Sequence, residues 1–438
     1  MTAHSTPNSA TSARIEVTTD ALMTRDHTRS ARYVTVRVTA PPADLGKPQR
    51  SLHVALVLDR SGSMSGEKIR LAREATAKAL RMLRPSDRFT LVCFDDTVDV
   101  VQPSTLATRE AVQSALQTLA GIDARGSTNL SDAWTEGCRQ LGDGLSSAAV
   151  TRCILLTDGR ANQGIRDPDK LIELARGLRL AGIHTSAFGL GRDFDEMLLN
   201  GIATAGGGRF CYIEQAVQIS DFLQSELGEA LEVSVRGVTL HLRTGDELGI
   251  ELLSHFDVKD VAGGRDIALG DLLADQELEI GLRVKLPRRG EGEVMRLDVH
   301  ASDRDQIFAG VHAGVQWTSA SNSANNQQVR DSTVRRACAV LEADKARYQA
   351  LVANRDRDYL KAQGLLQHVL KRLQPAAALD PQLQPIVDGL LLDLERLAIP
   401  MEEDHRKAIH YGTSLSSKSR DSDGFVRRSG QRGPGTSL

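Results

Sequence analysis

The stretch that decides the fold runs from His53 to Gly66 and reads HVALVLDRSGSMSG. Its first half is a short apolar run typical of a strand, and it breaks at Asp59 into a turn rich in small hydroxyl side chains. A helical pattern follows from Glu67 to Leu83. In open α/β sheets, ligands collect where strands end and helices begin. The stretch therefore predicts an α/β domain with a binding site at this turn.

Oxygen-bearing side chains fall in three separate stretches, each at a place where an apolar strand should give way to a loop. The five residues are Asp59, Ser61, Ser63, Thr128 and Asp158. Such oxygens suit Mg2+, Mn2+ or Ca2+, whereas Zn2+ prefers His or Cys, which are missing from these turns. Two carboxylates and three neutral hydroxyls cannot saturate an ion that prefers about six ligands. The sequence therefore predicts a site for one hard divalent ion, with a position open to an acidic group from outside.

The three stretches also resemble a known family. They are Asp59-x-Ser61-x-Ser63, Gly126-Ser-Thr128-Asn-Leu and Leu156-Thr-Asp158-Gly. Taken alone, each is a common helix cap or turn. Their joint occurrence and order resemble the metal-ion-dependent adhesion site of von Willebrand factor type A domains, over about residues 50–231.

The resemblance implies direct metal contacts from the two serines and the threonine, and contacts through water from the two aspartates. It implies a non-enzymatic module that uses Mg2+, or Mn2+ or Ca2+, to bind an Asp or Glu of a partner protein. In such domains metal ligation can also couple to a shift of the last helix, here about residues 215–231.

Hydrophobic patterning organises the rest of the chain. Apolar runs alternate with amphipathic stretches through residues 50–231, which predicts a doubly wound, mostly parallel, Rossmann-like sheet with helices on both faces. Half-apolar alternation at 14–48 and 232–318 predicts antiparallel strands. Because the N-terminal strands are too few to bury a core, we predict that they join the later ones in one β-sandwich, into which the α/β domain is inserted.

Boundaries of individual elements follow from the same patterns. Strands of the α/β domain are expected at 52–58, 88–94, 98–101, 152–157, 182–189 and 208–212. Its helices are expected to begin at Glu67, Arg109, Leu130, Asp169, Asp193 and Gln215.

The C-terminal part is expected to be helical. Residues 329–412 carry three apolar stripes at helical spacing, which predict three helices. Residues 1–13 and the Ser-, Gly- and Arg-rich residues 413–438 lack apolar periodicity and are expected to be disordered. This overall plan resembles bacterial type A proteins and, more distantly, the inter-alpha-trypsin inhibitor heavy chains.

Composition excludes several classes of protein. A formal charge of -3 and only 4% aromatic residues argue against nucleic-acid binding. The lack of a run of about 18 apolar residues argues against a membrane span, and the polar N-terminal segment does not resemble a signal sequence, so we expect a cytoplasmic protein. The five scattered cysteines are interpreted as buried structural thiols. The oligomeric state and the partner stay open.

Two other functions also stay open. A Mg2+-dependent hydrolase or phosphotransferase could use Asp59 as its nucleophile, although Ser61 stands where such enzymes usually place a second carboxylate. A scaffold could act through the C-terminal helices while the metal stabilises the fold. Three further polar residues receive structural interpretations: His184 as a core or strand-edge histidine, and Asp95 and Asp96 as surface turn residues.

Overall fold

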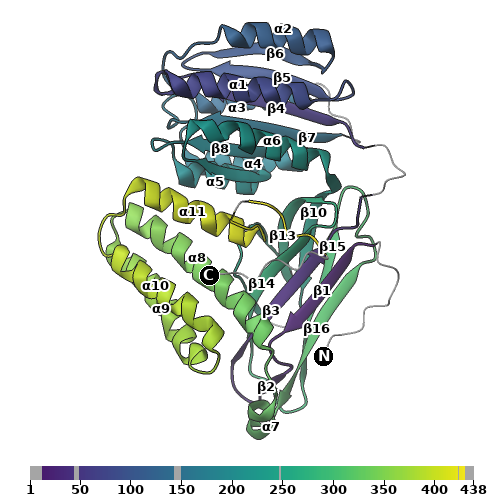
Figure 1. Cartoon of the computed structure of the whole chain (residues 1–438). Helices are drawn as coiled ribbons and strands as arrows, with labels where there is room; N and C mark the ends of the chain where they lie inside the picture. Colours follow the sequence, from purple (N-terminus) through teal and green to yellow (C-terminus); the bar gives the residue numbers. More distant parts are fainter. Residues whose placement is uncertain (1–11, 44–48, 143–148, 246–247, 423, 430–438) are drawn as a thin grey trace. The chain divides into compact units, whose positions relative to one another are not determined.

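The computed structural model describes residues 12–43, 49–142, 149–245, 248–422 and 424–429. The chain divides into two compact units, one of Met1–Pro42 with Val238–Leu438 and the other of Ala43–Gly237. We call them the outer unit and the inserted unit, because the second interrupts the chain of the first. An α/β domain inserted in a β-sandwich, with helices after it, is the predicted architecture, and it is confirmed (Figure 1).

The inserted unit is built on a six-stranded sheet in the order β6-β5-β4-β7-β8-β9. Its strands are β4 (Leu52–Asp59), β5 (Arg88–Phe94), β6 (Val98–Leu106), β7 (Val150–Thr157), β8 (His184–Leu190) and β9 (Gly207–Ile213). Neighbouring strands are parallel except β5 and β6. Every residue of β4, β7 and β8 is buried, as expected for inner strands of a sheet that is covered on both faces.

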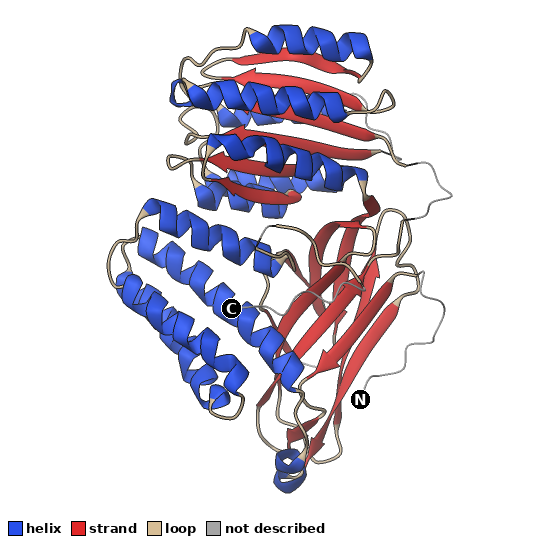
Figure 2. Cartoon of the chain, in the orientation of Figure 1, coloured by secondary structure: helices blue, strands red, loops and turns tan. Residues whose placement is uncertain are grey.

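Helices cover both faces of this sheet (Figure 2). They are α1 (Glu67–Met82), α2 (Arg109–Ala120), α3 (Leu130–Gly142), α4 (Pro168–Ala181), α5 (Glu196–Ala205) and α6 (Ile219–Leu231). Gly137 of α3 allows a close approach to the sheet, because a Cβ at this position would lie 2.5 Å from Val57 Cγ2. Trp134 of the same helix is fully buried, and its indole N–H donates to Thr185 Oγ1 at 3.2 Å. These contacts fix α3 against the middle of the sheet.

Two sheets form the sandwich of the outer unit, in the orders β1-β3-β14-β11 and β12-β13-β10-β15-β16-β2. The strands are β1 (Arg14–Thr19), β2 (Met23–Arg25), β3 (Ser30–Thr39), β10 (Val233–Arg243), β11 (Gly249–Leu252), β12 (Asp257–Val261), β13 (Gly264–Leu273), β14 (Glu277–Leu286), β15 (Val294–Ser302) and β16 (His312–Ala320). β3 pairs with β14 and β2 pairs with β16, so the N-terminal strands complete both sheets. β2, β11, β12 and β13 were not individually predicted. β2, β11 and β12 are too short to show a pattern.

The sandwich is followed by helices α7 (Asn322–Gln327), α8 (Ser332–Arg355), α9 (Tyr359–Ala377), α10 (Gln384–Arg396) and α11 (Glu403–Ser417). α8 packs on β3 and β14, where Tyr33, Leu253, Val334, Cys338 and Leu341 form one buried cluster. The prediction of three long helices over 329–412 misses α11. Its buried side chains are mostly polar, including Lys407, Thr413 and Ser414, so it lacks the apolar stripe that identifies α8 to α10.

The expected disorder of residues 413–438 is wrong for the described part of that segment. Residues 413–417 belong to α11. Farther on, the N–H of Glu277 donates to the carbonyl of Arg427 at 2.8 Å, and the N–H of Ser429 donates to the carbonyl of Asp275 at 2.8 Å. These contacts are between backbone groups and need no apolar side chains, which explains why the composition did not reveal them. Residues 430–438 and 1–11 lie outside the described residues, and Ala13 is buried just before β1.

Candidate metal centre

The two predicted carboxylates meet at the carboxyl edge of the central strands. β4 ends at Asp59, β7 ends at Thr157, and the two strands pair in parallel with Leu58 opposite Leu156. Asp59, the last residue of β4, and Asp158, the first residue after β7, therefore lie at the same edge of the sheet. Both are 0% exposed. Burial of two carboxylates at one strand edge is costly unless hydrogen bonds or a cation compensate for it.

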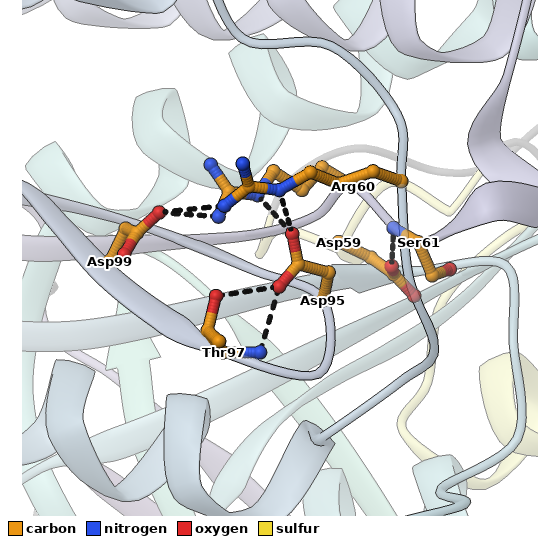
Figure 3. A network of polar contacts seen from close by, with 7 residues as sticks. Asp59, Arg60, Ser61, Asp95, Thr97 and Asp99 are labelled. Carbon is orange, nitrogen blue, oxygen red and sulfur yellow. Dashed lines mark hydrogen bonds and ion pairs between the residues drawn. The ribbon is translucent and has the colours of Figure 1, made fainter.

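Hydrogen bonds connect four of the five predicted residues. Asp59 Oδ1 accepts from the N–H of Ser61 at 2.7 Å (Figure 3). The hydroxyl oxygens of Ser61 and Ser63 lie 3.1 Å apart, and the Ser63 hydroxyl donates to Asp158 Oδ1 at 2.6 Å. The short 3-10 turn of residues 62–64 shapes this loop, and fully buried Met64 anchors it. The loop after β4 is thus joined to the residue after β7.

Thr128 reaches the same place from the loop before α3. Its Oγ1 lies 3.0 Å from the position that a Cβ of residue 159 would take, and Asp59 Oδ2 lies 3.8 Å from that position. The N–H groups of Asn162 and Gln163 donate to the carbonyl of Thr128 at 3.1 and 3.3 Å. The structure therefore brings all five predicted residues to one edge of the sheet. Gly159 has no side chain that would fill the space between Thr128 and Asp59.

Sequence reasoning missed two residues that contact the carboxylates directly. The hydroxyl of Thr157 donates to Asp59 Oδ2 and accepts from the N–H of Gly159 at 3.1 Å. Lys68, in the first turn of α1, places its Nζ 2.5 Å from Asp158 Oδ2 and 3.3 Å from the carbonyl of Ser63. A hydroxyl directly before Asp158 was a visible signal for Thr157. No sequence signal points Lys68 toward a residue so far along the chain.

The electrostatics of Asp59 favour a bound cation. Burial raises the pKa of Asp59 to about 6, although hydrogen bonds from Thr157 and Ser61 act in the opposite direction. Within the described residues, no group of three or more His, Cys, Asp and Glu side chains could hold a metal ion. A site here must therefore combine the two carboxylates with hydroxyl oxygens, which is the donor chemistry of a hard divalent ion. The residues present fit such an ion.

A second set of charges lies beside this edge (Figure 3). Asp95 Oδ2 is 2.9 Å from Arg60 Nε and 2.7 Å from Arg125 Nε, and Arg60 also pairs with Asp99. Asp95 Oδ1 accepts from both the N–H and the hydroxyl of Thr97 at 2.7 Å. Burial opposes ionisation of Asp95, but the bonds from Arg125 and Thr97 hold its pKa well below the usual range.

This network corrects one interpretation from the sequence. Asp95 is 0% exposed and is not a surface turn residue, whereas Asp96 is exposed as expected. Asp95 joins loops that are distant in sequence, since Arg60 and Arg125 arrive from the turns after β4 and before α3. The N–H of Arg125 also donates to the carbonyl of Arg60 at 2.8 Å. The network therefore holds the loops that carry Ser61 and Thr128 against each other.

The remaining polar residues that the sequence singles out are structural. His184 lies buried in β8, with Nδ1 3.4 Å from the carbonyl of Gly207. All five cysteines are buried free thiols, and burial raises the pKa of Cys93 to about 12. None of the helices in the described part of the chain has both the length and the apolar character needed to cross a membrane.

Comparisons with known proteins agree with this geometry. Residues 53–225 match the family model of the von Willebrand factor type A domain. The chain is 27% identical over 236 residues to the Escherichia coli protein YfbK, covering 50% of this chain and 40% of YfbK. It is 34% identical over 182 residues to human inter-alpha-trypsin inhibitor heavy chain H4, covering 39% of this chain and 20% of that protein. The match thus spans less than half of each relative.

Solved structures resemble nearly the whole chain. A von Willebrand factor type A protein from Catenulispora acidiphila superposes with a TM-score of 0.69 at 17% identity, covering 94% of this chain and 97% of that one. The ArnB paralog VWA2 from Sulfolobus acidocaldarius gives a TM-score of 0.59 at 14% identity, covering 95% and 100%. At such identities the likeness concerns the fold. Residues 53–225 of this chain therefore form a von Willebrand factor type A domain.

Proposed function

We propose that this chain is a non-enzymatic, divalent-metal-dependent protein-binding module. In this proposal Ser61, Ser63 and Thr128 hold the ion directly, and Asp59 and Asp158 hold it through water. The observation that carries the proposal is the convergence of two fully buried carboxylates with these hydroxyls at one sheet edge. Type A domains generally serve metal-dependent adhesion and protein interaction, and residues 53–225 are such a domain.

Oxygen donors favour Mg2+, with Mn2+ or Ca2+ as substitutes. When bound, the ion supplies a Lewis-acidic position that two carboxylates and three neutral hydroxyls leave unsaturated. Side chains of the site set the side from which a ligand can reach that position. Ser63 is the exposed member of the set, so it marks the solvent-accessible side, whereas Asp59 lies fully buried behind it. An acidic group from solvent therefore approaches past Ser63.

The partner we propose is a protein that offers an Asp or Glu side chain. α1 begins at Glu67, directly after the metal-binding loop, and the N-terminal end of a 16-residue helix favours negative charge. α6 is separated from β10 by Glu232 alone, so a shift of α6 on binding would be passed directly to the chain of β10. The buried free thiols suit the reducing cytoplasm that we propose as its compartment.

The geometry favours binding over covalent catalysis at Asp59. A nucleophilic carboxylate needs a free oxygen aimed at the substrate. Here Oδ1 accepts from Ser61, Oδ2 accepts from Thr157, and the residue is 0% exposed. Asp59 therefore orients the loop, and we do not propose a hydrolase or phosphotransferase.

Calorimetric titration with Mn2+ tests the metal site. We expect wild type to bind one ion, Asp59→Ala to lose binding, and Ser65→Ala to bind as wild type, because Ser65 lies in the same loop but outside the set. Circular dichroism must show that the variants are folded. Wild type that binds no Mn2+, Mg2+ or Ca2+ would refute the proposal.

Partner capture then tests the function. Immobilised wild type and Asp59→Ala are exposed to lysate with Mg2+ or with a chelator, alongside a phosphatase assay. Capture that needs both Asp59 and Mg2+, without turnover, is the expected result. Capture that is equal in every arm would instead support a scaffold acting through α8 to α11, and turnover that Asp59→Ala abolishes would support an enzyme.

A further inference from the structure

Lys68 brings a positive charge into direct contact with the five-residue site. Its Nζ lies 2.5 Å from Asp158 Oδ2 and 3.3 Å from the carbonyl oxygen of Ser63. The lysine side chain is 33% exposed, whereas the Asp158 side chain is 0% exposed. A Cβ at Gly191, in the turn after β8, would lie 3.9 Å from the same nitrogen. Lys68 is thus held between the metal-binding loop and the neighbouring turn.

This contact sets the charge of the site. Asp59 and Asp158 contribute two negative charges and Lys68 contributes one positive charge, which leaves the three groups at -1. In the adjacent cluster two arginines, Arg60 and Arg125, pair with two aspartates, Asp95 and Asp99, and exposed Asp96 also acts on Arg125, so this cluster brings no excess of positive charge to the site. A divalent ion would bring the three groups to +1, and one carboxylate from a ligand would return them to zero.

We infer that Lys68 makes the binding of the metal ion and of the acidic ligand interdependent. The inference rests on the proposed function of the site. The ammonium group repels a divalent ion that arrives alone, and it attracts the carboxylate that completes the ion's coordination. By linkage, a carboxylate ligand raises the affinity for metal by the same factor by which metal raises the affinity for the carboxylate. Lys68 is therefore a residue that determines selectivity for acidic ligands.

A merely structural lysine would behave differently. An ion pair that only anchors α1 would leave metal affinity and its response to a carboxylate unchanged when replaced, and would alter stability alone. The two roles therefore separate in a metal titration. The fixed charge of Lys68 is what matters here, so Lys68→Arg should retain the behaviour of wild type.

The experiment titrates the full chain with Mn2+ at constant ionic strength, in sodium chloride and in sodium acetate, with acetate as the carboxylate probe. Lys68→Met removes the charge. Lys78→Met is the matched control, because it removes the same charge from an exposed position on the same helix, about 15 Å along its axis. In chloride we expect Lys68→Met to bind Mn2+ about tenfold more tightly, the order expected for removing a unit charge beside a divalent ion in a water-accessible site.

Acetate should raise the Mn2+ affinity of wild type and of Lys78→Met, and should raise that of Lys68→Met several-fold less. Weak binding of acetate to free Mn2+ affects all proteins equally and cancels in this comparison. Lys68→Gln keeps a donor for Asp158 and should change the Mn2+ affinity in the same direction. It replaces the methionine variant if that variant does not fold. Unchanged or weaker Mn2+ binding by the folded neutral variants overturns this inference alone, whereas wild type that binds no Mn2+ overturns the proposed function with it.

Discussion

Replacing Arg60 with methionine should destabilise the inserted unit more than replacing Arg125, although both arginines bind the same carboxylate. Arg60 is 5% exposed at its side chain and bonds Asp95 at 2.9 Å, whereas Arg125 is 62% exposed and bonds the same oxygen at 2.7 Å. Asp95 is fully buried, so each lost bond leaves part of its charge uncompensated. Water can replace the bond to exposed Arg125 more readily than the bond to buried Arg60, so the two losses should differ in their effect on stability.

The magnitude follows from that difference. A buried hydrogen bond to a charged group contributes about 1.5–3 kcal/mol, whereas an exposed ion pair contributes about 0–1 kcal/mol. We therefore expect Arg60→Met to lower the free energy of unfolding by about 2–3 kcal/mol, and Arg125→Met to lower it by a clearly smaller amount. For a domain of about 150–250 residues, each kcal/mol lowers Tm by about 2–4 °C, so Arg60→Met should cost about 5–10 °C.

Differential scanning calorimetry on the full chain measures this directly, because the two units can unfold in separate transitions. A double-mutant cycle with Asp95→Leu supplies the control, since the penalty of Arg60→Met should shrink when its buried partner is already apolar. Equal losses for the two arginine variants, or a loss below about 0.5 kcal/mol for Arg60→Met, would refute the view that burial sets the strength of this network.

Three further outcomes are expected. Gly159→Ala should weaken Mn2+ binding about tenfold in calorimetry with little change in Tm, because its Cβ would lie 3.0 Å from Thr128 Oγ1 and must displace it. Gly137→Ala should lower the unfolding free energy by about 1–3 kcal/mol in urea, since its Cβ would meet Val57 Cγ2 at 2.5 Å; unchanged stability would contradict the close packing of α3. Burial lowers the pKa of His53 to about 4, so the unfolded chain takes up this proton from about pH 6.5 downward and the folded chain only near pH 4. Stability should therefore fall by up to about 3 kcal/mol as pH drops from 6.5 to 4, and His53→Gln should flatten that part of the pH profile.

Local patterns were sufficient to predict the elements that carry the site. The expected strand over 52–58 is β4, and the helix expected from Glu67 is α1. Such a prediction succeeds because β4 is buried on both faces, so its whole run is apolar, and because a glycine-containing turn separates it from an amphipathic helix.

Contacts between distant loops could not be predicted in the same way. The burial of Asp95 depends on Arg60 and Arg125, which approach it from two other loops. The contact of Lys68 with Asp158 joins residues 90 positions apart. Neither contact leaves a periodic signal, because each is set by the tertiary positions of the loops. α11 was missed for a related reason, since polar side chains fill its buried face.

The pairing of β3 with β14 has a consequence for synthesis of the chain on the ribosome. Thr39 pairs with Glu277, so β3 cannot pair with β14 until the whole inserted unit has been translated. At about 5–20 residues per second this delay lasts on the order of tens of seconds. The inserted unit can fold during that interval, whereas the edges of β1 and β3 stay unprotected. Nascent chains halted before β14 should therefore be the species most dependent on chaperones.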